Sequence, residues 1–311
     1  MSVPQLHEPV LKSEVIEALS IKAGGTYIDA TFGRGGHTKS ILNSLGFDGR
    51  LVALDRDPEA FAYAVKLQDC DSRLLVAHTN FGQINKIPQT ADLLNSTDGI
   101  LFDLGVSSPQ LSDSNRGFSF LRDGPLDMRM NPTSGITARE WLNSATEAEI
   151  ADTLYKYGEE RFSRRIARDI TLAREFSDIS TTGQLAEIIK QANPAWEKEK
   201  HPATRAFQAI RILINNELDE LRRGLDGAFQ LLAEGGRLVV ISFHSLEDRI
   251  VKRFISDHVK GDSFPRRLPV TSGFLKPQLK KIKKPAKANY KEVRDNPRAR
   301  SAIMRVAQKL T

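Results

Sequence analysis

The chain has 311 residues, a net charge of +6 and a single cysteine, Cys70. This length is enough for one to three domains, and one cysteine excludes an internal disulfide and a cysteine-based zinc cluster. No apolar run approaches the roughly 20 residues that a membrane span needs, and Glu8, Glu14 and Glu17 interrupt the segment where a signal peptide would lie. We therefore expect a cytoplasmic protein that does not enter a membrane.

The first predicted strand, residues 26–30, contains Asp29 and runs into a loop with three glycines, Gly33, Gly35 and Gly36. Glycines allow a tight turn and a close approach to a ligand, and the helix expected from about Thr38 points its N-terminal amides the same way. A dinucleotide site needs G-x-G-x-x-G to seat a pyrophosphate. The order G-x-G-G, with an acid four residues earlier, favours a cofactor with an amino-acid end, such as S-adenosylmethionine. An ordinary glycine-rich turn is the alternative.

Three further strands are predicted at residues 50–55, 74–78 and 98–103. The second and fourth strands of the chain end in Asp55 and Asp103, and Phe81 follows the third. Ligands bind at the carboxyl ends of strands in open α/β sheets. Asp55 is therefore placed to accept hydrogen bonds from a ribose diol, and Phe81 is suited to lie against an adenine. Each residue also has a purely structural alternative, as a helix cap or as part of the core.

The α/β series continues with a helix over about 216–232, a fifth strand at 237–242 and a last strand at 300–307. A crossover needs only one helix, yet residues 105–236 separate the fourth strand from the fifth. We therefore predict a discontinuous core, 1–105 and 213–311, and an inserted helical domain, 106–212, for substrate recognition. Its first helices are indicated by two capping-box patterns, Thr137-x-x-Glu140 and Thr146-x-x-Glu149, and by an apolar stripe at 150–157. Further helices are predicted over about 182–192, which Asn193-Pro194 ends, and 203–214.

The positive charge is concentrated at the end of the chain. Residues 261–311 hold 14 Lys and Arg against 3 Asp and Glu, a net charge of +11, so the remaining 260 residues carry −5. The run Lys280–Lys284 and the helical arginines Arg161, Arg164, Arg165 and Arg168 are either solvated faces or contacts for nucleic-acid phosphates. Beside a cofactor domain, we favour phosphate contacts for the C-terminal run and expect residues 256–298 to be irregular.

Several segments, in this order, resemble the bacterial small-subunit (16S) ribosomal RNA cytosine-N4 methyltransferase family, also called MraW. They are residues 27–37, 103–110, 116–120, 124–129, 201–205, 242–249 and 296–300. The resemblance implies a Rossmann-like methyltransferase fold with an inserted helical domain, S-adenosylmethionine as methyl donor without a metal, and a cytosine in the decoding centre of the small ribosomal subunit as acceptor. It also implies cofactor contacts at Gly35, Gly36, His37, Asp55, Phe81, Asp103 and Gln110.

The chemistry directs attention to Asp103. Methyl transfer to a cytosine amine needs that amine held in line with the donor methyl, and a nearby acceptor can take its proton. Many such enzymes have Asn/Asp-Pro-Pro-aromatic after the fourth strand, whereas this chain has Asp103-Leu-Gly-Val and keeps only the acid. Asp103 is therefore the candidate catalytic residue, and a stacking ring would come from elsewhere, with candidates Phe118, Phe120, Phe243 and His244.

Three other functions fit the sequence less well. A carbon-5 pyrimidine methyltransferase needs a cysteine nucleophile, and Cys70 precedes the third strand, away from the cofactor edge. The loop spacing argues against a nicotinamide dehydrogenase. A non-catalytic RNA-binding module would not need the full set of residues at the cofactor edge. The oligomeric state is not indicated by the sequence.

Overall fold

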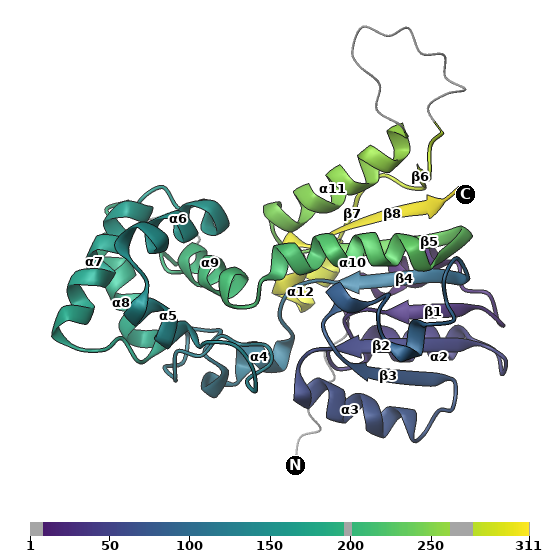
Figure 1. Cartoon of the computed structure of the whole chain (residues 1–311), viewed down its shortest axis with the longest axis horizontal. Coiled ribbons are helices and arrows are strands. Elements are labelled where there is room, and N and C mark those ends of the chain that lie inside the picture. Colours follow the sequence, from purple (N-terminus) through teal and green to yellow (C-terminus); the bar gives the residue numbers. More distant parts are fainter. Residues whose placement is uncertain (1–8, 196–200, 262–275, 311) are drawn as a thin grey trace, which may run out of the picture. The chain divides into compact units, whose positions relative to one another are not determined.

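The computed structural model describes residues 9–195, 201–261 and 276–310, and the chain divides into two compact units (Figure 1). The sheet unit combines Met1–Gly105 with Leu218–Thr311, and the helical unit is Val106–Glu217. The second boundary lies after residue 217, whereas the sequence placed it after residue 212. Helix α9 (Thr204–Ile214) spans the earlier position and packs Phe207 and Ile210 into the core of the helical unit.

In its described residues, the sheet unit has eight strands in the order β3-β2-β1-β4-β5-β8-β6, with β7 paired to β8. Strands β1 to β5 are parallel, whereas β6, β7 and β8 are joined by antiparallel pairing and β8 is antiparallel to β5. The bounds are β1 Thr26–Asp29, β2 Arg50–Asp55, β3 Leu74–His78, β4 Thr97–Asp103, β5 Leu232–Ser242, β6 Leu279–Lys281, β7 Ala286–Lys287 and β8 Ile303–Lys309. The predicted α/β fold is confirmed, and the strand order reverses between β1 and β4, where such sheets bind ligands.

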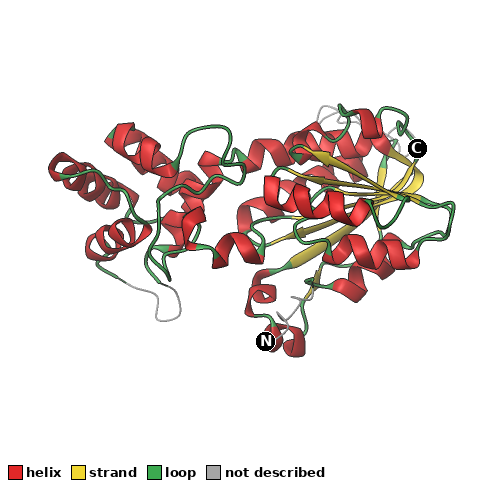
Figure 2. Cartoon of the chain, turned by 90° about the horizontal axis from the view of Figure 1, so that it is seen from below, coloured by secondary structure: helices red, strands yellow, loops and turns green. Residues whose placement is uncertain are grey.

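Helices cover both faces of this sheet (Figure 2). Alternate residues of a strand point to opposite faces, so Tyr27 belongs to one apolar core and Ile28 to another. The first core is closed by α1, α2 and α3, and the second by α10 and α11. The helices of the sheet unit are α1 Lys12–Leu19, α2 Gly36–Ser44, α3 Pro58–Gln68, α10 Glu217–Leu231, α11 Ser245–Lys260 and α12 Tyr290–Asp295, with 3-10 turns η1 Phe81–Gln83, η2 Pro88–Thr90 and η5 Pro297–Ser301.

The helical unit has its own apolar core, formed by Leu142, Ile150, Leu154, Ile166 and Leu185 among others. Its elements are α4 Ser108–Ser112, η3 Ser114–Arg116, α5 Ala138–Ser144, α6 Glu147–Gly158, α7 Ser163–Phe176, α8 Thr182–Ala192 and α9. Both predicted capping boxes are confirmed at α5 and α6. Among the described helices, none has the length and apolar character that crossing a membrane would require.

The prediction that residues 256–298 are irregular is wrong for their described part. Helix α11 continues to Lys260, and the segment after residue 275 forms β6, β7 and α12. Strand β6 escaped notice because Leu279-Lys-Lys281 reads as a charged run, yet lysines are common on edge strands, where they discourage further pairing. Residues 262–275, including Arg266 and Arg267, lie outside the described part of the chain.

Candidate functional site at the carboxyl edge of the sheet

The loop after β1 adopts a conformation that requires glycine. Gly33 and Gly35 have φ angles of 56° and 71°, which L side chains rarely adopt, and a Cβ at Gly35 would lie 2.9 Å from the ring of Phe32. A Cβ at Gly36, where α2 begins, would lie 3.1 Å from the ring of Pro9. The predicted glycine loop is present. Close contacts with Phe32 and Pro9 are enough to explain why Gly35 and Gly36 carry no side chain.

Two threonines connect this loop to the neighbouring elements. Asp29, fully buried at the end of β1, accepts hydrogen bonds from Thr38 Oγ1 at 2.6 Å and from the Thr31 backbone N–H at 3.1 Å. Thr31 Oγ1 in turn accepts a bond from the backbone N–H of Asp103 at 2.6 Å. Asp29 and the two threonines thus join the ends of β1 and β4 to the start of α2. Sequence reasoning missed both threonines, because neither belongs to a periodic pattern.

Asp55, at the end of β2, binds the glycine loop directly. Its Oδ2 accepts the Gly33 backbone N–H at 2.7 Å, and its Oδ1 accepts the Asp57 backbone N–H at 2.8 Å. Burial raises the pKa of Asp55 to about 6, although both backbone bonds act to lower it. A carboxylate offers about four lone-pair positions, so Asp55 keeps acceptor capacity for a ligand at this edge.

Asp103 and His37 face each other between β4 and α2. His37 Nε2 lies 3.6 Å from Asp103 Oδ2, and the His37 side chain is 5% exposed. Burial lowers the pKa of His37 to about 4, so its imidazole is neutral at pH 7. Burial, together with the negative charges of Asp29 and Glu247, raises the pKa of Asp103 to about 8. Neutral His37 therefore provides no counter-charge for Asp103.

The second carboxyl oxygen of Asp103 also lacks a partner that would stabilise a negative charge. Asp103 Oδ1 is buried and has no hydrogen-bond partner among the residues that the structure describes. Buried polar groups in native proteins are nearly always hydrogen-bonded, and exceptions concentrate at functional sites. The carboxyl is thus stabilised in its neutral form until a cation or a donor reaches it, which makes this position suited to a positively charged ligand.

Phe81 lies where the sequence placed it, immediately after β3. It opens the 3-10 turn η1, is half-buried, and meets the Phe102 ring edge-on with centroids 5.7 Å apart. A Cβ at Gly224 of α10 would lie 3.0 Å from the Phe81 ring. Phe81 therefore packs on the second apolar core, as the structural alternative stated, while part of its ring stays open to a ligand.

Gln110 belongs to the helical unit, and its side chain serves α4. Its Oε1 accepts the backbone N–H of Ser107 at 2.9 Å, and the two residues form a capping box. Of the seven predicted cofactor residues, the other six lie in the sheet unit, at or near the carboxyl ends of β1 to β4. The side chain of Gln110 is buried by this local role.

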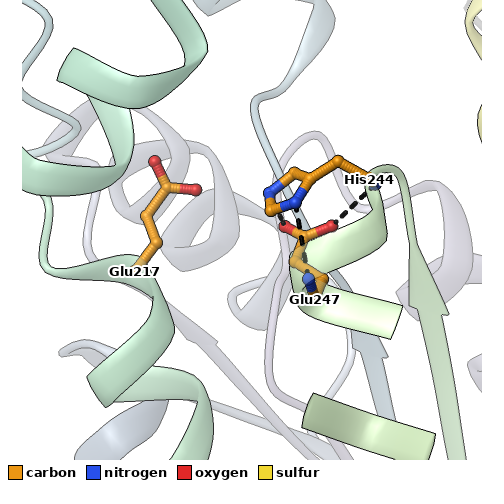
Figure 3. Close-up of side chains that lie close together, drawn as sticks. All are labelled: Glu217, His244 and Glu247. Carbon is orange, nitrogen blue, oxygen red and sulfur yellow. Dashed lines mark hydrogen bonds and ion pairs between the residues drawn. The ribbon is translucent and has the colours of Figure 1, made fainter. Parts of the chain in front are cut away.

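A further acid, which sequence reasoning did not single out, lies after β5. Glu247, 3% exposed, accepts the backbone N–H of Phe243 at 2.8 Å, and its Oε1 is 3.1 Å from His244 Nε2 (Figure 3). His244 is the N-cap of α11 and forms a capping box with Glu247. The signal was the spacing His-x-x-Glu, which a search for Ser or Thr caps does not find. Glu217, also drawn, makes a bidentate pair with Arg211 inside the helical unit, with both N–O distances 2.8 Å.

The four candidate stacking rings have different environments. Phe118 is buried in the core of the helical unit, which leaves it no face for a base. Phe120 is half-buried in the same unit. In the sheet unit, Phe243 is half-buried against the first apolar core, and His244 is engaged with Glu247 as described.

The known proteins that this chain resembles match it over nearly its whole length. The model of the MraW methylase family matches residues 4–310. "Ribosomal RNA small subunit methyltransferase H" of Nitrosococcus oceani is 53% identical over 306 residues, covering 98% of this chain and 97% of that protein. The protein of the same name from Idiomarina loihiensis is 54% identical over 306 residues, with the same shares covered. A solved SAM-dependent O-methyltransferase from Thermotoga maritima aligns with a TM-score of only 0.42 and 10% identity, over 100% of this chain and 69% of that one.

Proposed function

Because this chain belongs to the MraW methylase family, we propose that it methylates the exocyclic N4 amine of a cytosine in 16S ribosomal RNA, at the decoding centre, with S-adenosylmethionine as donor. The observation that supports this most is the half-buried carboxyl of Asp103, which has one buried, unpartnered oxygen and only a neutral histidine beside it. S-adenosylmethionine carries an α-ammonium group and a sulfonium charge, and either one would supply the missing counter-charge.

Different residues at the sheet edge would bind different parts of the cofactor. The loop Gly33–His37 would receive its amino-acid end, because α2 begins there and presents backbone amides. Asp55 would accept hydrogen bonds from the ribose diol in addition to its two backbone bonds. Phe81 would lie against the adenine, and Gly35, Gly36 and Gln110 complete the set that the family resemblance implies.

Asp103 has two roles to offer in the transfer itself. The bound cofactor supplies an electrophilic methyl on a positively charged sulfur, and the cytosine amine gains that methyl carbon and loses a proton. Asp103 can hold the α-ammonium of the donor, or it can hold the amine and accept its proton. A carboxyl with a pKa of about 8 is matched to proton transfer near neutral pH. The two roles are separable by experiment, because only the second affects the rate more than the affinity.

The RNA would contact the basic end of the chain. Lys280 and Lys281 lie on the edge strand β6, and both are exposed, as is Lys284. Lys283 differs from them, since its Nζ lies 2.6 Å from Glu17 Oε1. Phosphate neutralisation by lysines is independent of base sequence and falls with salt, so this surface would provide affinity while the sheet edge provides the chemistry.

The direct test is methylation of purified small-subunit ribosomal RNA taken from cells that lack this protein. The full chain is incubated with S-adenosylmethionine and the RNA, which is then digested to nucleosides and analysed by mass spectrometry. We expect N4-methylcytidine, mapped to one position of the decoding centre. The appearance of 5-methylcytidine, or of no methylated cytidine in RNA or in assembled subunits, would overturn the proposal.

A matched control uses the carboxyl at the proposed centre. Asp103→Asn keeps the shape of the side chain and removes its acidity, so N4-methylcytidine should fall to background at equal enzyme concentration. Lys22→Gln alters an exposed ion pair with Asp98 at the start of β4, the opposite end of the strand from Asp103, and should leave the yield unchanged.

A further inference from the structure

Two sequence motifs that the proposed function leaves unused meet in the helical unit. The segment 116–120 ends in Phe120, and the segment 201–205 begins with His201. The two rings are stacked, with centroids 4.5 Å apart and planes inclined by 29°. Residues 81 positions apart in the chain thus form one aromatic pair, which neither motif indicates by itself.

Phe120 is held in place by packing against the core of the helical unit. Its ring meets the Phe207 ring edge-on, with centroids 4.9 Å apart and planes at 75°, and Phe207 is a buried residue of α9. The chain reaches Phe120 through Gly117, whose φ of 71° and crowded surroundings leave no room for a side chain. Phe120 is therefore a fixed support, and its position costs little further ordering when a ligand binds.

His201 covers Phe120 and is itself exposed. Its Nδ1 accepts the backbone N–H of Ala203 at 3.2 Å, and its carbonyl oxygen accepts the N–H of Thr204 at 3.0 Å. Because Nδ1 is used as an acceptor, the neutral ring carries its proton on Nε2. The pair thus presents a flat, oriented ring together with a hydrogen-bond donor at the ring edge.

We infer that the Phe120–His201 pair is a stacking platform for a nucleobase of single-stranded RNA. The inference rests on the proposed function for the identity of the ligand as RNA. Proteins that recognise unpaired RNA stack bases on Phe, Tyr, Trp or His side chains and hydrogen-bond their edges, and stacking accepts any base because each has a π-face. The Phe120–His201 pair supplies both an aromatic face for stacking and a hydrogen-bond donor for a base edge, and its two rings are already stacked on each other.

The charge of the helical unit suits the same partner. Arg164, Arg165 and Arg168 project from α7 of the helical unit and are exposed. Within the described residues they have no ion pair, unlike Arg139 and Arg211 of the same unit. Exposed arginines that are not neutralised by acids are suited to phosphate contacts, so the helical unit offers contacts for both the backbone and a base of RNA.

The structural alternative is that His201 only holds the turn before α9 by accepting the Ala203 N–H, and two substitutions separate the roles. His201→Asn keeps a side-chain acceptor for the Ala203 N–H but removes the ring. His201→Phe keeps the ring but removes the acceptor. Each full-length variant is titrated by fluorescence anisotropy with a labelled single-stranded oligocytidine and with an abasic oligomer of equal length.

If the platform stacks a base, His201→Asn should weaken oligocytidine binding about tenfold and leave abasic binding unchanged. His201→Phe should bind oligocytidine as the natural chain does. Tyr155→Ala, which removes an aromatic ring that is 69% exposed on α6, should change neither titration. Equal affinities for the natural chain and His201→Asn, or equal losses in the Asn and Phe variants, would overturn the platform.

Two further readouts keep the result decisive. If His201→Asn lowers the melting temperature, Phe120→Leu takes its place, because it removes the supporting ring and leaves the bond between Ala203 and His201 intact. The methylation assay with the natural chain is scored separately. A chain that methylates cytosine while His201→Asn binds normally refutes the platform alone, whereas ring-dependent binding without any methylation refutes the proposed function alone.

Discussion

Acidic side chains have opposite environments in the two units. In the helical unit, Glu140 and Glu149 accept hydrogen bonds from the backbone and hydroxyls of the capping residues Thr137 and Thr146, and these bonds lower the pKa of both glutamates. At the carboxyl edge of the sheet, burial dominates and raises the pKa of three acids, Asp29, Asp55 and Asp103.

This difference distinguishes a region that is complete by itself from one that needs a ligand. The capping acids have donors within three residues, so their charges are satisfied as soon as each helix forms. Asp103 has a neutral histidine on one side and an oxygen without a partner on the other. Groups whose pKa is strongly shifted by burial and by like charge concentrate at functional sites, and Asp103 is such a group.

The largest expected effect comes from removing the acid at the centre of the edge. Asp103→Asn should lower the single-turnover rate of methyl transfer about a hundredfold if Asp103 accepts the amine proton. The cofactor affinity should fall by a smaller factor. Rapid-quench kinetics with enzyme in excess, together with calorimetry, measures both.

Because the pKa of Asp103 is about 8, the side chain is mostly protonated at pH 7 and Asn should preserve the fold there. An unchanged melting temperature at pH 7 is the control. If rate and affinity fall by the same factor, Asp103 is a cofactor ligand only. If neither changes, the centre of the reaction lies elsewhere, and Glu247 becomes the acid to examine.

Next in size is the loss of RNA affinity when the exposed lysines of the sheet unit are neutralised. Replacing Lys280, Lys281 and Lys284 by Gln together should reduce the slope of log affinity against log salt by about 2. Lys283→Gln is the matched control, since Lys283 is paired with Glu17 and should contribute less. Filter binding from low to moderate salt measures the slope, and an unchanged slope in the triple variant would identify the lysines as a solvated surface.

A smaller effect is expected at Asp55, where a ligand shares the carboxyl with two backbone donors. Asp55→Ala removes an acceptor for the ribose and should weaken cofactor binding about tenfold or more, at roughly 1.5–3 kcal/mol for a hydrogen bond to a charged group. Calorimetry measures the affinity. Because Gly33 also loses its partner, Asp55→Asn is run beside it, and normal affinity in both folded variants would rule out this role.

The smallest effect is expected at a helix cap of the helical unit, where the acid already has its donors. Thr146→Ala removes the N-cap of α6 and should lower the free energy of unfolding by about 1 kcal/mol, measured by denaturant titration. Cofactor affinity should be unchanged, because the cap is satisfied within the helical unit. A clear loss of cofactor affinity in this variant would contradict the separation between self-contained and ligand-dependent acids.

Much of the sheet unit follows from sequence patterns alone. Strands β1 to β4 were predicted because each is a short apolar run that ends at or just before a polar or aromatic residue, and the helical insert follows from the length between β4 and β5. Asp55 and Asp103 were found because the end of a strand is visible in the sequence. The unpartnered Oδ1 of Asp103 and the neutral His37 beside it are not visible there, since they depend on how closely α2 and β4 approach each other.

Other features depend on contacts that no local pattern records. Thr31 joins β1 to β4 through one side-chain hydrogen bond, and a lone threonine in a loop gives no such indication. Strand β6 forms because β8 offers a free edge, although its own sequence is mostly lysine. The pair Phe120–His201 results from the packing of α9 in the helical unit, and the two residues lie in separate motifs.

The measurement that tests the central claim most directly is the pH dependence of cofactor binding. Calorimetry of S-adenosylmethionine binding to the natural chain and to Asp103→Asn covers the range from about pH 6 to about pH 9, on both sides of the raised pKa of Asp103. Only the ionised carboxyl pairs with a cation, so binding to the natural chain must release the Asp103 proton at low pH. Affinity should therefore rise with pH from about pH 6 to about pH 8, and Asp103→Asn should lack this rise. A natural chain whose affinity does not change over this range, or a variant with the same rise, would contradict the claim that the edge awaits a cationic ligand.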